Sequence, residues 1–327
     1  MFIGSCVGTF FALDRKTGNV RWSYDIGRDG EQSGFHGNPL VAGDEILTGT
    51  DGSGIGHVYA FEMTTGKVRW KHPITKGAPS SYGLNSNLVA LGKNVFGAAI
   101  GDELISLSAE SGKLNWSFAS NLAGTAFRNP QSPAVGNDRV FFGGINGTVY
   151  ALAAESGGVI WKRDLGDRVS TNIVLAGNDL YAGIADGRFF RLNAKSGEIT
   201  AQIKLETTPV GLPVALADSL LLYLNRGGSG GGGQTLVSID PGLKQIRWQQ
   251  RASTNWSVAA RPFVWRSNVL AGTGEGEIRA FRVSDGKEMW SDTLKGTIRS
   301  FGASEPDPVL FIGTVEGMVY AYQPTKP

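Results

Sequence analysis

A short motif that ends in tryptophan recurs along the chain about every 44 residues. Its first seven copies read FFALDRKTGNVRW, VYAFEMTTGKVRW, LISLSAESGKLNW, VYALAAESGGVIW, FFRLNAKSGEITA, LVSIDPGLKQIRW and IRAFRVSDGKEMW, and an eighth begins in VYAYQPTKP. A period of roughly 40–50 residues is typical of β-propellers, in which each repeat forms one four-stranded blade. The repeat therefore predicts an all-β fold.

Each repeat has the pattern of strands rather than helices, because apolar residues alternate or run for four to six positions between glycine-containing turns. In the fourth repeat we predict strands A to D over Ser132–Val135, Arg139–Gly143, Thr148–Leu152 and Val159–Lys162. The pair Asn146-Gly147 predicts a two-residue hairpin with a type I′ turn between B and C. Counting strands gives seven A, eight B, eight C and seven D. This count favours eight blades of antiparallel strands over seven, within a single propeller domain over residues 1–327.

An eight-bladed propeller with these strands lacks strand A of the first blade and strand D of the last. Two alternatives remain open, an upstream start to the chain and first and last blades that are simply three-stranded.

The repeated tryptophan and glycine have a structural interpretation. The tryptophan falls on the outer strand, where its large side chain can dock against the next blade. The glycine supplies a turn conformation that residues with a β-carbon resist. Docking is predicted for Trp22, Trp70, Trp116, Trp161, Trp248 and Trp290. The fifth copy has Ala201 at this position, which predicts a weaker junction around the fifth blade.

Composition excludes several classes of protein. The 327 residues carry 31 Lys and Arg against 29 Asp and Glu, and this balance lacks the basic excess of a nucleic-acid-binding protein. Cys6 is the only cysteine, so an internal disulfide and a cysteine-based zinc cluster are both excluded. No apolar stretch has the length of a transmembrane helix, and the first residues show no signal peptide.

The repeated residues resemble the tryptophan-docking motif of the pyrroloquinoline-quinone (PQQ) repeat family, roughly A-x-D-x-x-T-G-x-x-x-W. Ala12, Asp14, Thr17, Gly18 and Trp22 match it in full, and the resemblance covers essentially the whole chain. The family includes quinoprotein dehydrogenases, which bind PQQ and calcium, and non-catalytic scaffolds such as the outer-membrane assembly lipoprotein BamB. The resemblance also implies a periplasmic or extracellular location.

Within this family we favour a non-catalytic binding or scaffold module without a cofactor, of the kind that takes part in bacterial envelope protein assembly, with a protein or peptide partner. The alternative is a PQQ- and calcium-dependent alcohol or sugar dehydrogenase, or a fragment of one. The resemblance implies that such enzymes stack PQQ between a tryptophan and a disulfide of adjacent cysteines. Cys6 alone cannot form that disulfide, and no residue here matches the calcium ligands or a catalytic aspartate.

The connections between strand D and the next strand A carry the candidate binding residues. Side chains just before each strand A are expected at one mouth of the central channel. Arginine and aromatic side chains there suit a protein partner, or a small anionic or planar ligand. The candidates are Tyr82, Arg128, Asn129, Arg168, Asn255, Trp256 and Arg299.

Three further motifs have structural rather than functional interpretations. The glycine-rich run 226–233 predicts an extended B–C loop, because a phosphate-binding loop would lead into a helix and this run leads into a strand. The loop 51–56 is a second extended B–C loop with one carboxylate, Asp51, and does not match a calcium-binding loop. Cys6 follows Ile3-Gly4-Ser5 as in a lipoprotein cleavage box, but its match to residues 311–314 favours a strand end of the first blade.

Overall fold

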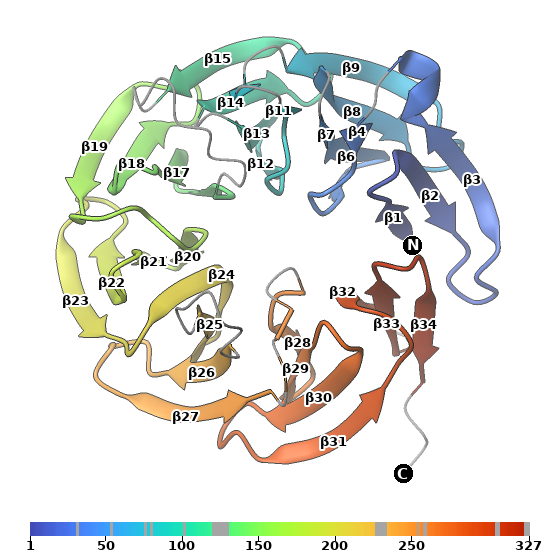
Figure 1. Cartoon of the computed structure of the whole chain (residues 1–327). Coiled ribbons are helices and arrows are strands. Elements are labelled where there is room, and N and C mark those ends of the chain that lie inside the picture. Colours follow the sequence, from blue (N-terminus) through green and yellow to red (C-terminus); the bar gives the residue numbers. More distant parts are fainter. Residues whose placement is uncertain are drawn as a thin grey trace. The chain divides into compact units, whose positions relative to one another are not determined.

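The computed structural model describes residues 1–30, 33–52, 55–74, 77–78, 81–100, 103–119, 131–225, 234–252, 254, 256–257, 260–304 and 308–323, with the backbone alone at 33, 77–78 and 81–82. The chain divides into two compact units, Met1–Val169 and Ser170–Pro327. Each unit is built from successive antiparallel sheets (Figure 1). The prediction of a single domain over residues 1–327 stays a prediction.

The fold class is an all-β propeller with eight blades in the described residues. The first unit holds blades one to four. Their strands are β1 (Phe2–Gly4), β2 (Thr9–Leu13) and β3 (Val20–Asp25) in blade one; β5 (Leu40–Ala42), β6 (Glu45–Gly49), β8 (Gly56–Glu62) and β9 (Val68–Ile74) in blade two; β12 (Val89–Leu91), β13 (Asn94–Ala99), β14 (Glu103–Ser108) and β15 (Leu114–Ala119) in blade three; and β16 (Ala134–Gly136), β17 (Arg139–Gly143), β18 (Thr148–Ala153) and β19 (Val159–Asp164) in blade four.

The second unit holds blades five to eight. Their strands are β20 (Val174–Ala176), β21 (Asp179–Gly183), β22 (Arg188–Asn193) and β23 (Ile199–Lys204) in blade five; β24 (Thr208–Ala215), β25 (Leu220–Asn225), β26 (Thr235–Ile239) and β27 (Ile246–Arg251) in blade six; β28 (Phe263–Trp265), β29 (Asn268–Gly272), β30 (Glu277–Arg282) and β31 (Glu288–Thr293) in blade seven; and β32 (Ile298–Ser304), β33 (Val309–Thr314) and β34 (Val319–Tyr322) in blade eight.

The two end blades are the three-stranded ones among the described sheets, as predicted. Blade one begins at its strand B (β1), and blade eight ends at its strand C (β34). In blade four the predicted strand B coincides with β17 (Arg139–Gly143). The outer strand β19 runs two residues further than predicted, to Asp164, because its pairing with β18 continues to Thr148.

The two-residue type I′ hairpin predicted at Asn146-Gly147 is wrong. Of this pair, only Gly147 has a positive φ, and its N–H donates to the carbonyl of Gly144. The Asn146 side chain instead closes the turn, since its Oδ1 accepts from the Thr148 N–H at 3.0 Å. The type I′ conformation occurs in the preceding A–B turn, where Asn137 and Asp138 both have positive φ.

Each described C–D strand pair contains an irregularity in register at the docking position. In blade two it lies between Ala60 and Phe61, and Ala60 pairs with Trp70. A small residue also stands opposite the tryptophan in the other blades that have one, namely Ala12, Ser106, Ala151, Ser238 and Ala280. A bulge bends and twists a strand locally, and here it re-aims the bulky side chain.

Four tryptophans contact the turn of the following blade within their own unit. The indole N–H of Trp22 donates to the carbonyl of Met63 at 3.0 Å. The same bond joins Trp70 to Ala109, Trp116 to Ala154 and Trp248 to Val283, at 2.8 to 3.1 Å. In each case the ring lies on the glycine of that turn, namely Gly66, Gly112, Gly157 and Gly286. The repeated tryptophan and the repeated glycine are therefore the two halves of one contact.

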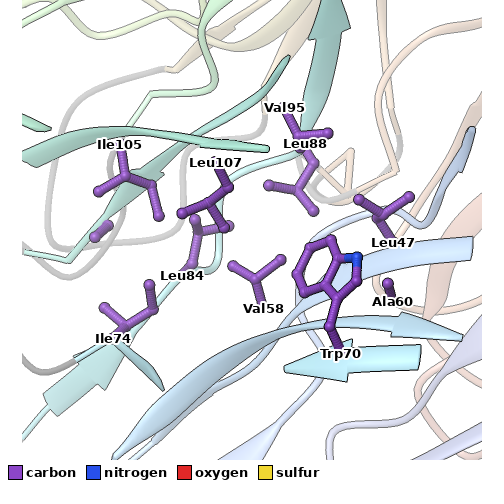
Figure 2. Packing of buried hydrophobic residues seen from close by; sticks show 11 residues of the cluster. Leu47, Val58, Ala60, Trp70, Ile74, Leu84, Leu88, Val95, Ile105 and Leu107 are labelled. Atoms are coloured by element: carbon purple, nitrogen blue, oxygen red, sulfur yellow. The ribbon is translucent and has the colours of Figure 1, made fainter. Parts of the chain in front are cut away.

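The core lies between adjacent blades rather than inside a single sheet. Figure 2 shows one such layer, in which Trp70, Val58 and Leu47 of blade two face side chains of blade three. The facing residues in this cluster are Leu84 and Leu88 of the connection before β12, and Val95, Ala99, Ile105 and Leu107 of blade three. Strands B and C of blade three are buried on both faces along nearly their whole length, which explains their apolar runs in the sequence.

Candidate functional site

The D–A connections and the B–C loops lie at the same end of each blade. This follows from the antiparallel order A-B-C-D, because strand D finishes at the end where strand B turns into strand C. Side chains from these loops can therefore meet, although they are far apart in sequence.

The described candidates from the sequence lie in different elements of both units. Arg168 and Arg299 are half-buried, the first in the connection after β19 and the second in β32. Tyr82 lies in the short strand β11 (Ser81–Gly83), of which the backbone at this residue is described. Arg128, Asn129 and Asn255 lie outside the described residues.

Trp256 belongs to the core of the second unit. Its side chain is 1% exposed, and its ring meets Phe281 edge-on at 6.0 Å between centroids. The guanidinium of Arg279 lies 5.8 Å from the Trp256 ring centroid and is held by the carboxylate of Glu288. The indole of Trp256 is thus covered by its own unit in this structure.

A small accessory sheet joins the loops of blades one to three. Its strand order is β10 (Gly77–Ala78), β11, β7 (Asp51–Gly52) and β4 (Ser33–Gly34). The central strand β7 comes from the extended B–C loop of blade two that the sequence singled out, and both D–A connections pair with it. Gly34 is required here, because a β-carbon at this position would lie 2.5 Å from the carbonyl oxygen of Cys6.

A cavity of about 380 Å³ lies between the B–C turn of blade one, the following D–A connection and β7. This volume falls within the range of ligand pockets, ~300–1,000 Å³. Four glycines and six larger residues line it, namely Gly8, Gly27, Gly34 and Gly52 with Cys6, Val7, Asp25, Ile26, His36 and Asp51. We refer to it as the His36 cavity.

The ionisable groups that line the His36 cavity include two carboxylates and one imidazole. Nδ1 of His36 donates to Oδ1 of Asp51, whose side chain is only 12% exposed. This contact fixes the imidazole, and in its neutral form it leaves Nε2 as an acceptor. Oδ1 of Asp25 accepts from the Gly27 N–H at 2.8 Å. Cys6 contributes an exposed thiol. The arrangement is rich in hydrogen-bond acceptors.

Asp29 anchors the wall that carries Gly27. It ends the 3-10 helix η1 (Ile26–Asp29) and accepts from Lys71 at 2.8 Å, from Tyr24 at 2.8 Å and from Tyr59 at 3.0 Å. Burial raises the pKa of this carboxyl, but the hydrogen bonds from Lys71 and the two tyrosines outweigh burial and hold the pKa below its usual range. The wall is therefore tied to strands of both blade one and blade two.

Sequence reasoning missed His36 altogether. It treated Asp51 as a loop carboxylate and Cys6 as a strand-end residue, and the structure brings both to one cavity with His36. The signal available was indirect, since the extra length of the 51–56 loop allows β7 to pair with both connections.

The donor set does not fit PQQ with calcium. Among the described residues, no three side chains of His, Cys, Asp and Glu lie together in a group that could hold a metal ion. The chain also has a single cysteine. Separately, within the described part of the chain, no helix reaches the length and apolarity that crossing a membrane requires.

Known proteins with similar sequences include outer membrane protein assembly factors. The family model described as "Outer membrane protein assembly factor BamB" matches residues 1–117 and 106–326. A protein of that name from Moranella endobia (strain PCIT) is 24% identical over 223 residues, which cover 63% of this chain and 56% of the relative. The match therefore spans about half the length of that relative.

Solved structures share the fold over nearly the whole chain. BamB from Moraxella catarrhalis superposes with a TM-score of 0.78 at 18% identity, covering 99% of this chain and 93% of that one. Quinohemoprotein alcohol dehydrogenase from Comamonas testosteroni gives 0.74 at 13% identity, covering 100% of this chain and 74% of the enzyme. At these identities the likeness shows the fold alone, and it does not separate scaffold from enzyme. The chain belongs to the family of the outer membrane protein assembly factor BamB, whose model matches it from residue 1 to residue 326.

Proposed function

We propose that this protein is a non-catalytic binding module that works in the assembly of bacterial outer membrane proteins. It acts in the periplasm and holds one or more protein partners of that process. It uses no cofactor.

The observation that carries the proposal is the extent of the family match. Two overlapping matches to the assembly-factor model run from residue 1 to residue 326, so the resemblance is not confined to the tryptophan-docking repeats of one region.

The loops at the D–A end of the blades are the proposed contact surface. Arg168, in the connection after β19, and Arg299, at the start of β32, are half-buried and stay candidates for a partner or an anionic ligand. Arginine is frequent among the residues that dominate binding energy in interfaces. Tyr82, Arg128, Asn129 and Asn255 remain candidates of the same kind.

The test is co-purification from the envelope of the source bacterium. The full chain, carrying an affinity tag, is cross-linked in cells and its partners are identified by mass spectrometry. We expect outer membrane assembly proteins to be enriched reproducibly over a tagged periplasmic control protein. Reproducible enrichment of electron-transfer proteins in their place would overturn the proposal.

A titration of PQQ in the presence of calcium tests the alternative of a quinoprotein dehydrogenase. The chain has eight tryptophans, so binding of the quinone would quench their fluorescence. We expect no saturable quenching at high micromolar PQQ. Saturable quenching at micromolar concentrations, with calcium-dependent dye reduction, would support the enzyme instead.

A further inference from the structure

The hairpin tip at the His36 cavity differs from its counterparts in other blades. Five described B–C hairpins share one turn, in which a glycine with positive φ donates its N–H to the residue three positions earlier. The residue before that glycine is polar in blades four, five, seven and eight, namely Asn146, Asp186, Glu275 and Glu316. In blade one it is Val7, whose side chain is 85% exposed.

Val7 is not needed for the turn, because the same turn forms with polar residues elsewhere. Exposed single apolar residues are common on protein surfaces. This one, however, stands on the rim of a cavity and replaces a polar residue that all four equivalent turns possess. Val7 therefore offers apolar contact at the edge of a cavity lined by polar groups.

The chemistry of the cavity selects a cation with many hydrogen-bond donors. The described residues that line the cavity include the carboxylates of Asp25 and Asp51 but no Lys or Arg. Each carboxylate uses Oδ1 in the bonds described above, and Nε2 of His36 is not used in the bond to Asp51. The described residues form no metal-binding group, which favours an organic cation over a metal ion. A guanidinium group has five N–H donors in a planar fork that matches carboxylates.

We propose that the His36 cavity binds an arginine side chain of an extended segment in a partner protein, and that Val7 packs against the apolar neighbours of that arginine. Asp25 and Asp51 accept from the guanidinium, and Nε2 of His36 accepts a further N–H. The inference rests on the proposed function only in taking the chain to be a protein-binding module.

The test uses a defined probe, the peptide acetyl-Leu-Arg-Leu-amide, and the intact protein labelled with ¹³C-histidine. The chain has three histidines, so the His36 signal is assigned with His36→Gln. We expect the His36 signal to shift saturably while His57 and His72 do not. The same peptide with neutral citrulline in place of arginine should bind at least tenfold more weakly.

Matched variants separate the cavity from general charge effects. Asp25→Asn and Asp51→Asn should each weaken binding at least fivefold. Asp164→Asn should leave binding unchanged, because Asp164 makes the same bond in blade four, to the Gly166 N–H at 2.8 Å, away from the cavity. Val7→Asn gives the turn of blade one the residue that blade four has at this position. It should weaken binding of the tripeptide about threefold and leave binding of acetyl-arginine-amide unchanged. Thermal unfolding midpoints confirm that each variant is folded.

Three results would overturn the inference: no shift of His36 up to about 10 mM peptide, equal binding of the citrulline peptide, or an equal effect of Asp164→Asn and Asp25→Asn. None of these results would contradict the proposed function, because that proposal is tested by the partners recovered in co-purification. If assembly proteins co-purify and the probe does not bind, the module holds its partner elsewhere.

Discussion

Trp22 and Gly66 form one contact between two blades. The indole lies on the turn glycine so closely that a β-carbon at residue 66 would be 2.4 Å from the ring. The indole N–H donates to the carbonyl of Met63 in the same turn. Blade two therefore supplies both the flat surface and the acceptor that hold the tryptophan of blade one.

Gly66→Ala tests this contact against a control with the same backbone conformation. Gly18 has a φ of +74° and nothing within 4 Å of its β-carbon position, whereas Gly66 has a φ of +72° and the Trp22 ring. Each variant should lose about 1 kcal/mol in the free energy of unfolding, because a residue with a β-carbon resists the left-handed conformation. Only Gly66→Ala must also displace the indole, which adds roughly 1–3 kcal/mol of overpacking. Urea unfolding measures the destabilisation of the Gly66→Ala and Gly18→Ala variants. Equal destabilisation would show that the contact between Trp22 and Gly66 is loose.

Trp116→Ala tests the same kind of junction between blades three and four. The indole of Trp116 donates to the Ala154 carbonyl at 3.1 Å and lies on Gly157. Removing a large, packed aromatic side chain costs roughly 3–5 kcal/mol. We expect a loss of that size in the free energy of unfolding, measured in guanidinium chloride. An unchanged unfolding midpoint would mean that Trp116 does not hold the two blades together.

The blade plan could be predicted from the sequence because the repeat encodes it locally. Each tight turn, each apolar run and each outer-strand tryptophan lies within one period, so the eight blades and the incomplete end blades follow from counting. The conformation of the B–C turn was predicted wrongly. The Asn146-Gly147 pair permits two left-handed residues, but the bond from Thr148 to the Asn146 side chain stabilises a turn in which only the glycine is left-handed.

The site could not be predicted because it depends on pairings between different repeats. His36 has no local motif, and only the pairing of Gly34 with Asp51 brings it to its partner. Trp256 presents the opposite case. Its position in a connection suggested exposure, and it is covered by Phe281 and Arg279 from strand β30 of the next blade.

The fifth junction lacks both halves of the docking contact. Ala201 replaces the tryptophan, Arg191 stands opposite it instead of a small residue, and Lys244 takes the glycine position. Leu243, with a positive φ, packs in the same cluster as Ala201. The hydroxyl of Tyr181 donates to the carbonyl of Pro241 at 3.1 Å, the acceptor position that an indole uses elsewhere. These contacts replace the dock, so the predicted weakness of this junction needs a direct test.

Tyr181→Phe removes the replacement bond without removing the ring. The Tyr181 side chain is 2% exposed, so the Pro241 carbonyl loses a buried partner. We expect a loss of roughly 0.5–1.5 kcal/mol in the free energy of unfolding. Tyr320→Phe is the control, because its bond to the Lys295 carbonyl is exposed, and it should cost less than about 0.5 kcal/mol. Equal costs in urea unfolding would contradict the assigned role of Tyr181.

Ala201→Trp tests whether the fifth junction could accept the usual dock. The turn of blade six offers no glycine at the matching position, and Leu243 already fills part of the cluster against which Ala201 packs. We expect the substitution to destabilise the protein by about 1–3 kcal/mol through overpacking. Hydrogen exchange of the amides in β23 and β26 would quicken selectively. A rise in stability would show that the space for an indole is present and unused.

Acid should weaken the protein partly through His72 in β9. Burial is the largest influence and lowers the pKa of this imidazole, and the nearby His57 lowers it further, while a hydrogen bond with the backbone of Gly112 opposes them. The unfolded chain, with a pKa near ~6.5, therefore binds a proton that the folded protein resists. Its contribution to stability is complete above that value and is lost as the pH falls toward the folded-state pKa. We expect His72→Gln to flatten the decline in the unfolding midpoint between about pH 7 and pH 5. Identical declines in the variant and the parent protein would assign the acid sensitivity to other groups.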